Sequence, residues 1–472
     1  MTGDSDIRQG VARTAQILLV LAAVLALYIV YLQVIKADDL VGDPLNRRRG
    51  QVEIGAVRGS IFAADGAILA YSDESGRHCP MGEDAAFVTG YATQNLGSTG
   101  LEHFANAALT GDNTDIAKLG PIDKLLRNFR GNDIWLTIDS RVQRAAYRAL
   151  ADKRGAAVVI DAQSGAVLAL VSTPAFDPNT VEEDWQALNS DDARPLLNRA
   201  TMGLYPPGSI IKPLIADAAL ATGETNDNEV FVCSGELDVG GGYHIGESHG
   251  EVHGRQKLAD AIANSCNVTF GTLAMRMGEK KLLQAFGRFG LDKTGEGELT
   301  WSAAHLPPKN DPLDDGDVAQ LGIGQSYLLA TPMSMALTAA AFANGGKVMR
   351  PYLIERIASE DGDVSFGAID KLYYEATDSA RAEKINEYMK GVVEHGTGKA
   401  AQIKGISVAG KTGTAENPGG EDHAWFIGSA DIGTRRVAFA VLVENGGSGA
   451  VAAAPIAREI LTTLAQESGG KS

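Results

Sequence analysis

Residues Tyr205–Pro213, "YPPGSIIKP", place a serine and a lysine three positions apart behind a proline pair and a glycine. The prolines and the glycine cannot continue a helix, so we expect a helix to begin at Ser209, with Lys212 one turn later on the same face. A serine hydroxyl becomes a nucleophile only beside a base, and a lysine amine can be that base when burial or a neighbouring cation keeps it neutral. The alternative is a helix cap followed by a solvated lysine, which this short motif alone would favour.

Two later motifs change that balance. "ANSCN" (263–267) follows an apolar helical stretch and supplies Ser265, whose hydroxyl can relay protons, and Asn267, whose amide can hold a carbonyl group. "VAGKTGTAE" (408–416) lies on an expected strand, where a lysine and two hydroxyls can hold a carboxylate while a glycine lets a ligand backbone approach: Lys411, Thr412, Gly413 and Thr414. Each triplet is weak alone. The three in this order are typical of penicillin-binding proteins and serine β-lactamases.

The pattern around these motifs predicts an α+β fold, an antiparallel sheet flanked by helices. "GAAVVIDAQSGAVLALVST" (155–173) predicts a β-hairpin. Apolar helical stretches fill residues 258–263 and 333–343. Near the end, "RVAFAVLVENG" (436–446) predicts a buried strand and "PIAREILTTLAQE" (455–467) predicts a final helix.

Two upstream stretches also carry secondary-structure signals. "VRGSIFAADGAILAYS" (57–72) predicts two short strands around a turn at 64–66. "DIWLTIDSRVQRAAYRAL" (133–150) predicts a strand followed by a helix with Asp139 and Ser140 as possible N-caps.

The N-terminal region predicts a membrane anchor. Residues 15–35, "AQILLVLAAVLALYIVYLQVI", are uncharged and long enough to span a bilayer. No convincing cleavage site follows, so we expect an uncleaved signal anchor, residues 1–14 in the cytoplasm and the rest of the chain outside. The alternative, a buried core helix, rarely runs this long without a polar stripe. We expect a small non-catalytic module of the pedestal or dimerisation kind at 36–130 and the catalytic domain at 131–468.

Composition excludes a nucleic-acid partner. Of the 472 residues, 59 are acidic and 42 basic, which gives a net charge of -17, and no basic cluster occurs beyond "NRRRG" at 46–50. The 44% hydrophobic content is enough for a large core. The three cysteines, Cys79, Cys233 and Cys266, are too few for a disulfide framework, and the sequence leaves open whether the last two pair.

Beyond the three motifs, the sequence resembles the class B penicillin-binding proteins, the membrane-anchored D,D-transpeptidases of bacterial cell-wall synthesis, and especially their short-linker PbpA-type members. "LTIDSRVQ", "LNRATMGLYPPGSIIKP", "LGIGQSYLLATPMSMA", "AGKTGTAE" and "HAWFIGSAD" follow the family order from about Asp133 onward. Upstream, "RGSIFAADGAILA" and "YATQNLGSTGLEHFAN" are similar to the family's N-terminal region. Ile210 and Ile211 depart from the pattern, since threonine and phenylalanine are common there.

The resemblance implies roles for the matching residues. Ser209 would attack the penultimate D-Ala carbonyl of a stem peptide, with Lys212 as general base and Ser265 in the proton relay. Asn267 would bind the donor peptide, and the backbone N–H groups of Ser209 and Thr414 would form the oxyanion hole. The residues that would hold the terminal carboxylate are Lys411, Thr412 and Thr414. An amine from a second stem peptide would then resolve the acyl-enzyme into a cross-link, β-lactams would acylate the same serine, and no cofactor is needed.

Two further expectations complete this scheme. Lys411 carries a like charge close to Lys212, which favours the neutral amine that a base requires. The resemblance also implies a membrane partner, a RodA/FtsW-type glycosyltransferase, contacted by the anchor and the small module. Two other functions stay open: a β-lactamase or carboxypeptidase on the same fold, recognised by rapid turnover of the acyl-enzyme, and a scaffold or β-lactam sensor with vestigial catalytic residues.

One cluster suggests metal binding instead. "YHIGESHGEVHG" (243–254) brings together several possible ligands within ten residues: His244, Glu247, His249, Glu251 and His253. The glycines favour a flexible loop and argue against the helical H-E-x-x-H arrangement of zinc proteases. We therefore expect no metal in this protein.

Overall fold

The computed structural model groups the chain into two compact units. The first combines residues 1–53 with 92–98, and the second combines 54–91 with 99–472. The described residues are 3–32, 36, 57–111, 130–150, 152–308, 312–417 and 419–469. Residues 33–35 of the expected membrane span, and residues 37–56 and 112–129 of the expected module, therefore lie outside the described residues.

The first unit contains the long apolar helix α1 (Gly3–Val30). Within it, the segment Arg13–Val30 has a mean hydropathy of 2.1 and is long and apolar enough to cross a membrane. This segment covers most of the span that the sequence predicts. The other described element of the unit is a short antiparallel hairpin of β4 (Ala92–Thr93) and β5 (Gly97–Ser98).

A five-stranded antiparallel sheet organises the second unit. In spatial order its strands are β17 (Val408–Ala415), β18 (His423–Ile432), β19 (Arg435–Val443), β7 (Gly155–Asp161) and β8 (Val167–Thr173). The β7–β8 hairpin and the buried strand β19 confirm two of the predictions from the sequence. The strand with the K-T-G motif, β17, lies at one edge of this sheet.

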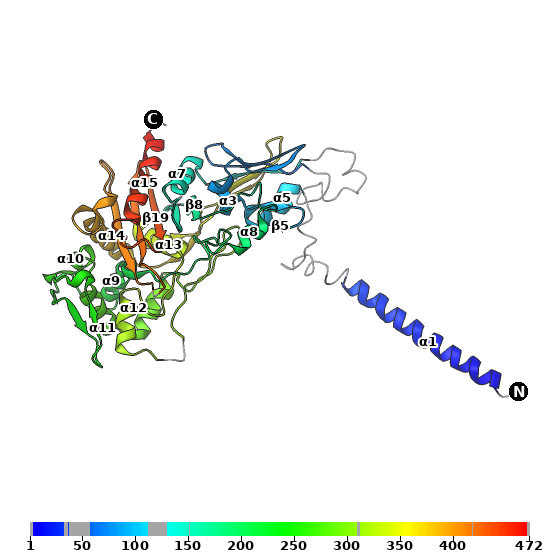
Figure 1. The fold of residues 1–472 in the computed structure, drawn as a ribbon, viewed down its shortest axis with the longest axis horizontal. Coiled ribbons are helices and arrows are strands. Elements are labelled where there is room, and N and C mark those ends of the chain that lie inside the picture. Colours follow the sequence, from blue (N-terminus) through cyan, green and yellow to red (C-terminus); the bar gives the residue numbers. More distant parts are fainter. Residues whose placement is uncertain are drawn as a thin grey trace. The chain divides into compact units, whose positions relative to one another are not determined.

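Helices cover both faces of the sheet because its strands are apolar on both sides. Successive side chains of a strand point to opposite faces, and in β19 Ala440 faces a core that contains α13 (Pro332–Ala343). The preceding residue, Phe439, faces a second core that contains α7 (Ser140–Leu150) and α15 (Ala453–Gly469). Figure 1 shows α7 and α15 beside the strands. The predicted helices at 258–263, 333–343 and 455–467 are confirmed as α10, α13 and α15.

A second sheet joins strands that are far apart in the sequence. Its order is β15 (Val364–Gly367), β14 (Ile354–Ala358), β6 (Asp133–Leu136), β1 (Ile61–Phe62), β2 (Ile68–Asp73) and β3 (Gly76–His78). The β1–β2 hairpin confirms the predicted turn, and β6 pairs in parallel with β1 and antiparallel with β14. The sheet therefore crosses the domain boundary expected near residue 130, and that division of the chain stays a prediction.

Shorter elements fill the remaining described parts. The helices and 3-10 turns are η3 (Gly82–Ala85), α3 (Ala86–Thr89), α4 (Gly100–Phe104), α5 (Asn106–Thr110), α8 (Trp185–Ser190), η6 (Ser248–Gly250), α12 (Asp315–Gly322), α14 (Ser379–Glu394) and η7 (Lys399–Ala401). The strands are β10 (Glu236–Asp238), β13 (Lys347–Met349) and β16 (Leu372–Glu375).

A buried ion triad fixes α4 against the second sheet. Glu102 is 0% exposed, and its carboxylate lies 2.7 Å from Arg58 Nη2 and 2.6 Å from Arg77 Nη2. Arg58 Nη2 also donates to the backbone carbonyl of Glu102 at 2.9 Å. Because both guanidinium groups are buried, the single carboxylate is needed to balance their charge.

We predict that Glu102→Gln lowers the free energy of unfolding by about 3–5 kcal/mol, because it leaves two buried guanidinium groups without a counter-charge. The measurement is chemical denaturation of the full chain in detergent. Glu360→Gln is the control, since Glu360 is exposed and lies 3.5 Å from Arg130, and we expect a change below about 0.5 kcal/mol there. Equal effects of the two substitutions would contradict the prediction.

Candidate active site

Ser209 lies in the 3-10 turn η5 (Gly208–Ile211), which leads directly into α9 (Lys212–Ala221). This confirms the helix start expected at the serine. Gly208 has a φ of 55°, and a Cβ atom there would lie 2.7 Å from the carbonyl oxygen of Thr414. Only glycine fits this backbone conformation and this contact. The turn therefore packs directly against β17, which puts Ser209 beside the strand.

Lys212 is fully buried, and oxygen atoms surround its amine. Nζ donates to the carbonyl oxygen of Ser265 at 2.5 Å, to Oδ1 of Asn267 at 2.7 Å and to Oγ of Ser265 at 3.3 Å. Burial lowers the pKa of Lys212 to about 8, although the charge of Glu247 acts in the opposite direction. A substantial neutral fraction of this amine therefore exists near neutral pH, as a general base requires.

The S-x-N motif forms the turn between α10 (Leu258–Ala263) and α11 (Asn267–Arg288). Ser265 has a φ of 60°, a left-handed conformation that is uncommon for a residue with a side chain. This conformation accompanies the two contacts of its oxygens with the lysine amine. At the start of α11, Asn267 Nδ2 donates to the carbonyl oxygen of Gly246 at 2.8 Å. Both the oxygen and the nitrogen of the Asn267 amide are therefore hydrogen-bonded.

Lys411 is the second fully buried lysine, and its Nζ donates to the carbonyl oxygen of Thr412 at 3.0 Å. Burial, and then the charge of Lys212, lower the pKa of Lys411 well below its usual value. From the sequence we expected burial or a neighbouring cation to lower the pKa of Lys212, with Lys411 as the cation. The main cause there is burial, and the repulsion is the second cause at Lys411.

The other K-T-G residues line β17 in different ways. Oγ1 of Thr412 lies 2.5 Å from Oγ1 of Thr397, and Thr414 is exposed. A Cβ atom at Gly413 would lie 2.8 Å from Cγ2 of Ile210, so the segment that approaches this glycine is the η5 turn of the chain itself. Within the described residues, no other strand pairs with the outer edge of β17.

Two residues that the sequence analysis did not place in the active site belong to its framework. Glu247 accepts the backbone N–H groups of Asn267 and Val268, both at 2.8 Å, at the start of α11. Burial alone would raise the pKa of Glu247, but these hydrogen bonds, together with one from Cys266 and the charge of Lys212, outweigh it and lower the pKa. The second residue is Thr397, the partner of Thr412. Neither belongs to a recognisable motif, because only the fold brings its segment to the site.

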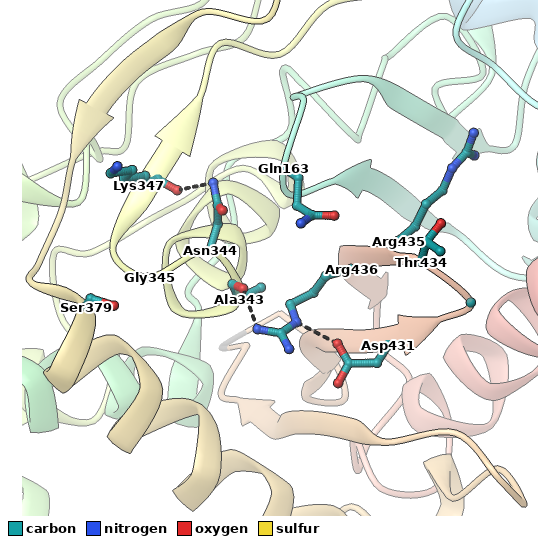
Figure 2. A pocket seen from close by; sticks show the side chains of 11 residues that line it. Gln163, Ala343, Asn344, Gly345, Lys347, Ser379, Asp431, Thr434, Arg435 and Arg436 are labelled. Carbon is teal, nitrogen blue, oxygen red and sulfur yellow. Dashed lines mark hydrogen bonds and ion pairs between the residues drawn. The ribbon is translucent and has the colours of Figure 1, made fainter.

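A polar cavity of about 650 Å³ lies elsewhere, next to the turn between β18 and β19 (Figure 2). In it, Arg436 Nε donates to Asp431 Oδ1 at 2.6 Å and Arg436 Nη1 donates to the carbonyl oxygen of Ala343 at 3.1 Å. Along β18, Asp431 is about 13 Å from Ile427 at the rise of a strand, and Ile427 is the partner of Lys411. The cavity is therefore separate from the serine–lysine site.

Comparison with known families agrees with this geometry. Residues 155–462 match the penicillin binding protein transpeptidase domain, and residues 58–128 match the penicillin binding protein A dimerisation domain. The chain belongs to the penicillin-binding protein transpeptidases. It is 32% identical to the peptidoglycan D,D-transpeptidase PbpA of Mycobacterium tuberculosis, over 92% of this chain and 94% of that protein. It is 29% identical to the peptidoglycan D,D-transpeptidase MrdA of Escherichia coli, over 81% of this chain and 66% of that protein.

Solved structures of penicillin-binding proteins share the fold. The crystal structure of PBPA from M. tuberculosis has a TM-score of 0.80 and 32% identity, and the match covers 87% of this chain and 99% of that one. The penicillin G acyl-enzyme complex of the same protein has a TM-score of 0.79 and 31% identity, with the same coverage. These likenesses confirm the fold class that the sequence predicts for this penicillin-binding protein.

We predict that the rate constant for acylation by benzylpenicillin rises with pH and levels off above about 8. The pKa of Lys212 is about 8. We expect Lys212 to accept the proton of Ser209, which only the neutral amine can do, so the active fraction should grow about tenfold per pH unit below that pKa. The measurement is intact-protein mass against time at a series of pH values. Lys212→Arg, which keeps its charge, should show no such rise. A flat profile of the folded wild type would contradict the prediction.

Proposed function

We propose that this penicillin-binding protein is a peptidoglycan D,D-transpeptidase with Ser209 as nucleophile and that β-lactams acylate this serine. The observation that carries the proposal is the fully buried Lys212, which Ser265 and Asn267 hold one helical turn from the serine. The names of the PbpA and MrdA relatives support the reaction class. The roles of the individual residues are our own assignment.

Acylation begins when Oγ of Ser209 attacks the carbonyl carbon of the penultimate D-Ala and the neutral amine of Lys212 takes the hydroxyl proton. The N–H groups of Ser209 and Thr414 stabilise the oxyanion, one at the start of the η5 turn and the other on the adjacent strand. Collapse of the intermediate breaks the peptide C–N bond. The proton passes from Lys212 through the hydroxyl of Ser265 to the leaving D-Ala amine, and an ester at Ser209 remains.

The edge strand β17 holds the donor peptide in this scheme. Its outer edge can pair with an extended peptide backbone, as sheet edges commonly do in peptide recognition. The terminal carboxylate lies against Lys411, Thr412 and Thr414. Its negative charge raises the pKa of the buried lysine and restores the ammonium form, which then pairs with it. Asn267 contributes its amide to the donor peptide from the opposite side.

Cross-linking follows when an amine of a second stem peptide attacks the ester carbonyl. The amine loses a proton to Lys212, a peptide bond forms, and Ser209 recovers its proton as the ester C–O bond breaks. Water in place of the amine would release a free acid, which is the reaction of a carboxypeptidase or a β-lactamase. The lifetime of the acyl-enzyme without an amine acceptor separates the two outcomes.

We predict that benzylpenicillin forms one lasting covalent adduct on the full-length protein and none on Ser209→Ala. The measurement is intact-protein mass over several hours. Ser164→Ala is a matched control, because this serine lies in the β7–β8 turn, and it should acylate like the wild type. An adduct on Ser209→Ala would contradict the assignment of the nucleophile. Rapid loss of the adduct with hydrolysed drug would replace the transpeptidase by a β-lactamase.

The proposal extends to the membrane. The helix α1 is a single anchor that leaves the catalytic residues outside the cytoplasm, and α1 and residues 36–130 contact a RodA/FtsW-type glycosyltransferase. The length and apolar character of Arg13–Val30 support the anchor. Because β1, β2 and β3 are part of the second sheet, deletion of the module would disturb the fold.

We predict that replacing α1 by an unrelated single membrane helix reduces stimulation of the glycosyltransferase partner. The measurement is glycan polymerisation by the two proteins in vesicles. Acylation by benzylpenicillin is the control for folding and should not change. Full stimulation by the chimaera would exclude α1 from the contact.

A further inference from the structure

Four potential metal ligands converge behind the S-x-N motif. They are Cys233, Glu247, His253 and Cys266, and one ligand atom from each lies within 4.8 Å of all the others. All three cysteines of the chain are free thiols in the structure, so the possible pairing of Cys233 with Cys266 is not formed there. None of these four side chains has a direct role in the proposed reaction.

Three separate segments deliver the four residues. The strand β9 (Phe231–Cys233) pairs with β12 (Gly254–Gln256), and the partner of Cys233 is Gly254, so His253 lies next to Cys233 across the pair. Glu247 directly follows β11 (His244–Gly246).

Cys266 immediately precedes α11 and caps it. The cluster is therefore fixed by strand pairing and by a helix start. It is not a loose loop.

The distances fit a tetrahedral zinc ion. Bond lengths of about 2.3 Å to sulfur and 2.0–2.1 Å to nitrogen and oxygen imply ligand–ligand separations of about 3.3–3.8 Å. Sγ of Cys233 lies 3.4 Å from Oε1 of Glu247 and 3.5 Å from Nδ1 of His253. Oε1 of Glu247 lies 3.0 Å from Sγ of Cys266 and 3.9 Å from Nδ1 of His253. Small side-chain shifts would place an ion between all four.

The imidazole of His253 has a second ring nitrogen, Nε2, that takes no part in these contacts. His253 Nε2 is buried and has no hydrogen-bond partner among the described residues. It lies 3.4 Å from Oε2 of Glu251. A histidine that binds metal through one ring nitrogen commonly donates the other N–H to a carboxylate, which orients the ring. With Nδ1 on the ion, Nε2 carries the proton and Glu251 is its natural acceptor.

We infer that Cys233, Glu247, His253 and Cys266 bind one zinc ion in a closed, four-coordinate structural site. Two sulfur ligands with one nitrogen and one oxygen suit zinc and exclude calcium and magnesium, which take oxygen ligands. Binding releases the two thiol protons, because cysteine binds zinc as the thiolate. All four positions are occupied by protein, so the ion has a structural role.

The expectation of no metal from the sequence is thereby revised. The histidines and acidic residues of the 243–254 segment do not by themselves have the spacing of the helical H-E-x-x-H motif. The structure brings in two cysteines from outside the segment, while His244 is exposed and takes no part in the cluster. Strand pairing across β9 and β12 is what makes the ligand set, and it leaves no spacing signal.

Zinc at this position would hold the catalytic framework. Glu247 fixes the start of α11 through the N–H groups of Asn267 and Val268, and Cys266 lies between Ser265 and Asn267 in the chain. The ion thus ties β9 and the 247–253 segment to the turn that holds Lys212. The four ligands are positioning residues for the lysine.

The first experiment is metal analysis of the full-length protein, purified in detergent with a non-chelating reductant. We expect about one zinc ion per chain in the wild type and in Cys79→Ser, which removes the buried cysteine outside the cluster. Cys233→Ser and His253→Gln should hold at least fivefold less zinc. Glu251→Gln should bind zinc about 10–100-fold more weakly.

Cobalt substitution keeps the test decisive if a variant fails to fold. Wild-type protein stripped of metal and given cobalt(II) should show a thiolate-to-cobalt charge-transfer band and the intense visible bands of tetrahedral cobalt. Zinc should raise its Tm and restore the rate of acylation by benzylpenicillin. Absence of the cobalt bands and of bound zinc in folded, reduced protein would overturn the inference. So would a Cys233–Cys266 disulfide, seen as a mass loss of two hydrogens, that persists under the reductant.

Discussion

The active site depends on keeping one lysine amine away from water. A buried ammonium is costly unless oxygen atoms replace its hydration shell. Among the described residues, Ser265 and Asn267 supply those oxygens to Lys212. Their positions depend in turn on the left-handed backbone at Ser265 and on the carboxylate of Glu247 at the start of α11. Burial lowers the pKa of Lys212, and the hydrogen bonds keep its amine in position, so the amine can lose a proton without moving.

Local signals in the sequence were sufficient for most of the fold. The continuous apolar run in β19, the hairpin of β7 and β8 and the helix start behind the proline pair each depend on near neighbours, so apolar patterns and turn residues reveal them. The order of the three motifs was sufficient to name the candidate residues. Direct hydrogen bonds link three of these residues, Lys212, Ser265 and Asn267.

What the sequence could not supply depends on contacts between distant segments. Thr397 meets Thr412, and Glu247 meets Asn267, only after the chain has folded. The sequence also could not decide whether burial or a neighbouring cation lowers the pKa of Lys212, because the complete burial of a lysine is not visible in a motif. The inferred zinc ligands Cys233, His253 and Cys266 likewise come together only in the folded chain.

The close fit between η5 and the segments around it limits how the site can vary. A methyl group at Gly208, Gly324 or Gly413 would overlap atoms of neighbouring segments, and the nearest distances would be 2.7, 2.1 and 2.8 Å. We therefore expect few routes for evolution under β-lactam exposure through these three positions, since a side chain at any of them would displace the turn that carries Ser209. Exposed side chains at the rim, of which Thr414 is an example, remain free to diversify. We therefore expect variation among members of the family to gather around the opening of the site, and Gly208, Gly324 and Gly413 to vary least.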